Sequence, residues 1–75
     1  MKKIKPASQF VLCIRSEGNE DLEPRKVYQV VPDPKAKTEG FLRIIDDSGE
    51  DYLYPAEYFV PIEVPKEAAK VLAVA

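Results

Sequence analysis

Residues 46–62 constrain the fold more than any other part of the chain, because they encode three structures in immediate succession. Asp, Ser and Gly fill positions 46–49, and these residue types tolerate the tight or left-handed backbone of a hairpin turn. Pro55 then presets one backbone angle of a helical turn, for which the next four residues leave room before residues 60–64 resume as a strand. A hairpin, one helical turn and a closing strand in this order are typical of a small closed β-barrel.

Short apolar runs elsewhere predict the other strands. Residues 10–15 and 26–31 are rich in β-forming side chains, and Pro32 must end the second run because proline cannot donate to a sheet ladder. We interpret residues 32–40 as a polar connection. The five expected strands are residues 10–15, 26–31, 41–45, 51–54 and 60–64.

The two ends of the chain differ from this middle part. We expect residues 1–8 to be a flexible basic arm, residues 9–64 to form the barrel, and residues 65–75 to form a helical tail. Strong helix formers fill residues 66–73, and helical spacing predicts an apolar stripe. That stripe consists of Ala68, Val71, Leu72 and Ala75. A helix this short either frays or is ordered by packing against the barrel or a partner.

Composition bounds what the protein can do. Its 75 residues suit one domain, and 45% hydrophobic with 32% charged residues is ordinary for a globular protein. No apolar run exceeds five residues, whereas a membrane-spanning helix needs about 20. Histidine is absent and Cys13 is the single cysteine, which excludes Ser-His-Asp catalysis and zinc sites built from imidazole or thiolate. We therefore expect a cytoplasmic, non-enzymatic protein without metal or cofactor, monomeric by default.

Two side-chain groups have a chemical and a structural interpretation. Cys13 lies within an apolar strand, so we expect a small buried hydrophobe and not a nucleophile. Four acids crowd the hairpin turn but lack the spacing of a twelve-residue calcium loop, which favours a solvated turn. These acids are Asp46, Asp47, Glu50 and Asp51.

The closing half of the chain resembles the SH3 (Src homology three) family. Ser48-Gly49-Glu50 matches the distal turn of that family, and Pro55-x-x-Tyr58 matches the motif of its single 3-10 turn. Leu22 resembles the leucine before the family's diverging turn. The resemblance covers roughly residues 10–64 and implies an all-β, five-stranded SH3-like barrel with a 3-10 turn before the last strand.

The resemblance also implies a place for a binding surface. SH3 domains bind polyproline helices in an aromatic groove flanked by acids of the first long loop. The chain departs from that pattern at three positions, because Ile14 and Ser16 align where the family has tyrosines, and Phe41 lies near the position of the groove tryptophan. The predicted partner is a protein or peptide, bound on a shallow face between the acidic loop and the 3-10 turn. The predicted partner-binding residues are Glu20, Asp21, Phe41, Tyr54, Pro55 and Tyr58.

Two alternatives concern the use of particular side chains. Tyrosines combine apolar area with a hydroxyl, so Tyr54 and Tyr58 could form an exposed functional cluster, although barrel packing is their simpler role. Strand alternation places Tyr52 and Tyr54 on one face and Leu53 on the other. Basic residues could instead bind nucleic acid, with a solubilising arm as the competing interpretation. Those residues are Lys2, Lys3, Lys5, Arg15, Arg25 and Lys26.

Overall fold

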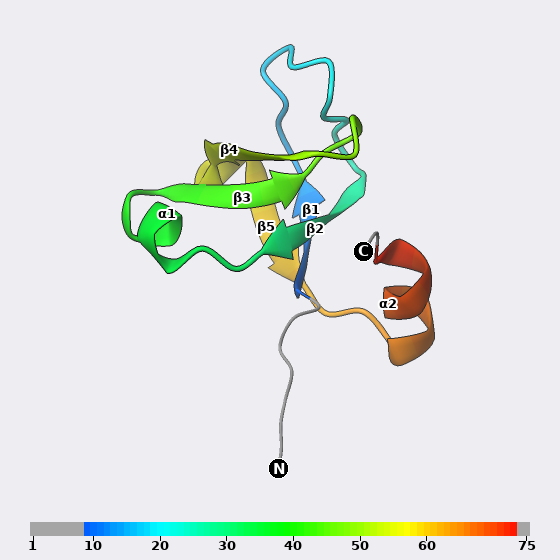
Figure 1. The fold of residues 1–75 in the computed structure, drawn as a ribbon. Coiled ribbons are helices and arrows are strands. Elements are labelled where there is room, and N and C mark those ends of the chain that lie inside the picture. The colour runs from blue at the N-terminus through cyan, green and yellow to red at the C-terminus, as the bar shows by residue number, and fades with distance from the viewer. Residues whose placement is uncertain (1–8, 74–75) are drawn as a thin grey trace.

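The structure is a computed structural model that describes residues 9–73. Five strands form one antiparallel sheet in the order β4-β3-β2-β1-β5 (Figure 1). The elements along the chain are β1 (Gln9–Cys13), β2 (Val27–Val31), α1 (Pro34–Thr38), β3 (Phe41–Ile45), β4 (Asp51–Pro55), the 3-10 turn η1 (Ala56–Tyr58), β5 (Phe59–Ile62) and α2 (Lys66–Leu72).

The sheet is open, which corrects the expectation of a closed barrel. β4 pairs with β3 and β5 pairs with β1, so these two strands form opposite edges of the sheet. Within residues 9–73 no ladder joins β4 to β5. The intervening η1 turns the chain between the two edges, and Pro61 in β5 lacks the amide hydrogen that a second neighbouring strand would need.

A helix within residues 32–40 contradicts the polar connection predicted there. The Asp33 side chain caps α1 by accepting a 3.1 Å hydrogen bond from the Ala36 amide, and Pro34 occupies the first helical turn. Ala36 is buried, so the helix packs one small side chain inward. Gly40, with φ of 88°, supplies the left-handed backbone between the end of this helix and the start of β3.

The core lies on one face of the sheet, where strand alternation directs side chains of every strand inward. Phe59 is central to it, because its ring meets those of Tyr28 and Tyr54 edge-on at centroid distances of 6.5 and 6.4 Å. Cys13 is 0% exposed, which confirms the prediction of a buried hydrophobe. The core cluster consists of Val11, Cys13, Leu22, Tyr28, Val30, Ile44, Tyr54 and Phe59.

The first and last strands are shorter or shifted relative to their predicted bounds. β1 ends at Cys13, and the amides of Ile14 and Arg15 donate instead to the Tyr58 carbonyl, at 2.8 and 3.3 Å. Phe59, expected within the helical turn, begins β5 because its extended backbone ends η1. The single turn itself is confirmed as η1.

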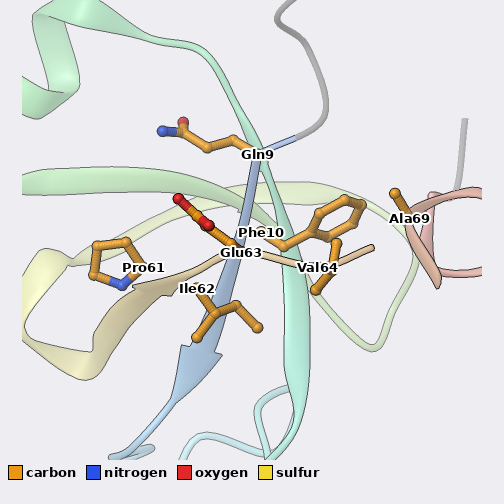
Figure 2. A pocket seen from close by; sticks show the side chains of 7 residues that line it. All are labelled: Gln9, Phe10, Pro61, Ile62, Glu63, Val64 and Ala69. Carbon is orange, nitrogen blue, oxygen red and sulfur yellow. The ribbon is translucent and has the colours of Figure 1, made fainter. Parts of the chain in front are cut away.

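The predicted tail helix is confirmed as α2, and its predicted stripe is confirmed at Ala68 and Leu72 but is wrong at Val71. Val71 is 83% exposed, whereas the half-buried side of the helix includes Ala68, Ala69 and Leu72. Figure 2 shows Ala69 on the side of α2 that faces the Phe10 ring, with Val64 beside that ring. The helix therefore approaches the sheet through its small side chains. Ala75 and the arm of residues 1–8 lie outside the described residues.

Candidate functional site

The predicted binding surface is built by backbone contacts around η1. The β3–β4 register places Phe41 opposite Pro55, and the Ala56 amide donates a 2.9 Å hydrogen bond to the Gly40 carbonyl. At the other end of the turn, the Ile14 amide donates to the Tyr58 carbonyl at 2.8 Å. These bonds hold parts of β3, η1 and the segment after β1 next to one another.

We use the name η1 face for four side chains carried by these segments: Ile14, Phe41, Pro55 and Tyr58. Ile14 is 47% exposed and Phe41 is 38% exposed, which is high for large hydrophobic residues. Pro55 and Tyr58 are half-buried, and Tyr58 also packs against the core cluster. The η1 face thus combines exposed apolar area with a rigid base, as binding surfaces do. Sequence reasoning named three of its members but assigned Ile14 only an alignment position.

Charged groups surround Tyr58. The Arg15 guanidinium lies over the Tyr58 ring, 6.0 Å from its centroid. Arg15 also forms ion pairs with Glu17 at 2.9 Å and Glu57 at 3.9 Å, and all three side chains are about half exposed or more. Two carboxylates sharing one guanidinium leave this group with a net negative charge.

The two predicted loop acids differ in their surroundings. Glu20 is exposed in the acidic loop. Asp21 is half-buried, and its carbonyl accepts a 3.0 Å hydrogen bond from the Asp47 amide, which ties the loop to the hairpin turn. Its own amide donates to the Asn19 side chain at 2.9 Å. The backbone of Asp21 therefore has a structural role, whereas the carboxylate of Glu20 is accessible to a partner.

Tyr54 belongs to the core and not to the η1 face. Its ring is only 7% exposed, and its hydroxyl donates a 2.5 Å hydrogen bond to Asp46. Burial, reinforced by the Asp46 carboxylate, raises the pKa of Tyr54. Tyr54 and Tyr58 consequently do not form an exposed pair. Tyr52 is 50% exposed, so the tyrosines divide between core and surface.

A second polar network joins the hairpin turn to the segment before β2. The Tyr28 hydroxyl donates to Asp47 at 3.1 Å and accepts from the Glu23 amide at 2.8 Å, while Lys26 pairs with Asp47 at 2.5 Å. Burial is the main reason that the pKa of Tyr28 is raised. The sequence offered no signal for this network, because its partners are 19 and 21 residues apart.

The acidic residues of the hairpin form hydrogen bonds or ion pairs with other side chains. Asp46 is buried and accepts from Ser48 and Tyr54, which corrects the expectation that all four acids are solvated. Glu50 accepts a 2.8 Å hydrogen bond from the Tyr52 hydroxyl, and Asp51 pairs with Arg43 at 3.3 Å. Within residues 9–73 no group of three or more metal-ligating side chains gathers.

The remaining chemical groups have structural surroundings. The Cys13 thiol donates to the Arg15 carbonyl at 3.2 Å, and burial raises its pKa, which disfavours the reactive thiolate. Of the basic residues considered for nucleic acid, Arg15 and Lys26 are paired with acids, and Arg25 is exposed. The lysines at positions 2, 3 and 5 lie outside the described residues.

Comparisons of the chain with protein-family models, curated proteins and solved structures gave no match. None of the helices described between residues 9 and 73 is both long and apolar enough to cross a membrane.

Proposed function

We propose that this protein is a non-enzymatic, SH3-like interaction module that binds a basic, extended segment of another protein on the η1 face. The observation that carries this proposal is that strand pairing and backbone hydrogen bonds bring together the segments that hold Ile14, Phe41, Pro55 and Tyr58, and that Ile14 and Phe41 are exposed there. The position of η1 between β4 and β5 supports the SH3-like assignment. Because the sheet is open, the similarity to SH3 domains consists of the order of the elements and the Pro55-x-x-Tyr58 motif.

The apolar side chains of the η1 face indicate which residues of the partner should contact it. Phe41 and Pro55 are cross-strand neighbours, so their side chains offer one adjoining apolar area. Ile14 and Tyr58, whose backbones are joined by a hydrogen bond, supply further apolar side chains. A shallow surface of this kind gains affinity mainly by covering rings and aliphatic side chains. An extended peptide with proline or leucine at alternating positions can cover these side chains.

The charges around the η1 face indicate which residues should lie beside the apolar residues of the partner. Glu17 and Glu57 share one cation, Arg15, and Glu20 adds a further exposed carboxylate in the same loop as Glu17. A lysine or arginine beside the apolar residues of the partner can pair with these acids. Such exposed pairs add specificity and salt dependence more than affinity.

The test is a titration of the isotopically labelled chain with a probe peptide of alternating proline and leucine residues that ends in two arginines. We expect amide resonances of Ile14, Phe41 and Tyr58 to move together and the Phe41→Ser variant to lose the response. Val71→Ser is the matched control, because it removes another exposed apolar side chain, on α2. A peptide that leaves all three resonances unmoved contradicts the proposal, and shifts confined to basic residues with single-stranded DNA would favour nucleic-acid binding.

A further inference from the structure

A cavity of about 500 Å³ lies between α1, η1 and the ends of the strands, and none of the four η1-face side chains lines it. Its apolar lining includes Val11, Val30, Leu42 and Phe59, which belong to the core cluster or pack against it. Ala56 of η1 contributes only a methyl group to the wall. The open edge between β4 and β5 and this small side chain leave space that the described side chains do not fill.

The rim of the cavity is rigid. Three prolines line it, Pro32 and Pro34 around the start of α1 and Pro61 in β5. Asp33 fixes α1 against the sheet, because one of its oxygens caps the helix and the other accepts a 2.8 Å hydrogen bond from Arg43. The prolines restrict the backbone and Asp33 tethers the helix, so the cavity is preformed. Little of a ligand's binding free energy is then spent on ordering the cavity walls.

The charges on the rim do not cancel. Asp33 and Arg43 line the cavity and neutralise one another, and Arg43 also reaches Asp51 outside the lining. Lys37 lines the cavity as well, is exposed, and forms no ion pair with any residue between positions 9 and 73. Among the charged side chains of the lining, Lys37 is therefore the one without an ion pair in the described residues, and it lies beside an apolar interior.

We propose that this cavity binds a small molecule with one apolar body and one anionic head group, of the class of medium-chain carboxylates. The body lies against Val11, Leu42 and Phe59, and the head lies at the rim near Lys37. The volume falls within the range of ordinary small-molecule sites, and the combination of an apolar interior with one polar anchor is typical of them. The cavity shares no lining residue with the four members of the η1 face, although Ala56 and Leu42 adjoin that face in the chain.

The experiment is a titration of the labelled full-length chain with decanoate, below its micelle concentration, followed by amide resonances. We expect saturable shifts at Val31, Leu42 and Ala56. Decyltrimethylammonium, which has the same chain and the opposite charge, should bind several-fold more weakly. Lys37→Glu should weaken decanoate binding by roughly three- to tenfold, whereas Lys35→Glu, the same charge change on α1 outside the lining, should change it by less than about twofold.

Ala56→Leu gives an independent test, because a larger side chain fills the cavity without altering its charge; it should weaken both amphiphiles. The absence of decanoate shifts overturns the proposal. Equal binding of the two amphiphiles by the original chain and by Lys37→Glu also overturns it, since the anionic head would then have no role. Shifts of the same resonances on dilution without ligand would identify a second copy as the occupant, and shifts caused by Ile4→Asp alone would identify the chain's own amino-terminal segment.

Discussion

The Tyr54 hydroxyl donates a 2.5 Å hydrogen bond to Asp46, which is 5% exposed and lies at the beginning of the hairpin turn that leads into the tyrosine's own strand. The second oxygen of Asp46 accepts from the amide and the hydroxyl of Ser48. Asp46 thus holds the turn and the core together, and Asp46 is the one charged side chain buried within residues 9–73.

Tyr54→Phe should lower the free energy of unfolding by about 1–3 kcal/mol, because it leaves a buried carboxylate oxygen without its donor. Urea denaturation measures the loss. Tyr52→Phe is the matched control on the same strand: its hydroxyl donates to Glu50 at an exposed position, so its removal should cost less than about 0.5 kcal/mol. Equal losses for the two variants would contradict the assigned role of Asp46.

Stability should fall in acid through Asp46. Burial alone would raise the pKa of Asp46, but hydrogen bonds from Ser48 and Tyr54 outweigh burial and hold the pKa below the ordinary value of 3.8. A folded-state pKa below the unfolded one contributes stability above the unfolded value, and that contribution is lost as pH falls through the folded value.

The urea midpoint should therefore decrease below about pH 4. Asp46→Asn should be less stable at neutral pH and show a shallower decrease in acid. Some decrease should remain, because hydrogen bonds from the Ala36 amide and Arg43 also lower the pKa of Asp33. An unchanged slope in Asp46→Asn would contradict the ionised state of Asp46 in the folded protein.

Asp33→Ala should loosen the start of α1, because the Ala36 amide loses its capping acceptor. The expected result is faster hydrogen exchange at Ala36. Asp51→Ala removes the other ion pair of Arg43 but no helix cap, so exchange at Ala36 should stay as it was. If both variants accelerate this amide equally, Asp33 acts through Arg43 and not as a cap.

Arg15→Ala should strengthen binding of the probe peptide. Arg15 covers the Tyr58 ring and engages Glu17 and Glu57, so its removal exposes the ring and frees both acids for the arginines of the peptide. We expect a dissociation constant lower by about two- to fivefold at low salt. Lys35→Ala makes the same change in net charge on α1 and should have a smaller effect, which isothermal titration calorimetry can resolve.

Much of the sheet could be predicted because its residues carry local signals. Short apolar runs rich in β-forming residues indicated the strands, and Pro55 with the glycine-containing turn indicated η1 and the hairpin. The helix α1 was missed although it has a recognisable start, since Asp33 before Pro34 is a cap followed by proline in the first turn. Interpreting Pro32 and Pro34 only as strand breakers hid that signal.

The features that could not be predicted depend on tertiary contacts. Alternation assigned Tyr54 a face of β4 but did not reveal that this face is the core, which removes Tyr54 from the binding surface. In α2, helical periodicity selected Val71, whereas the contact with the sheet runs through Ala69 opposite Phe10 (Figure 2). The burial of Asp46 depends on a tyrosine eight residues away. The hydrophobic pattern of one strand or helix does not show which of its faces packs against another element.

Binding of the partner on the η1 face can be tested by measuring the dissociation constants of the probe peptide for three proteins: the original chain, Phe41→Ser and Val71→Ser. Phe41→Ser removes a ring that is 38% exposed beside Pro55, so the fold should persist while affinity drops by about tenfold or more. Val71→Ser should bind like the original chain. Equal affinities for all three proteins, with each shown to be folded, would contradict the claim.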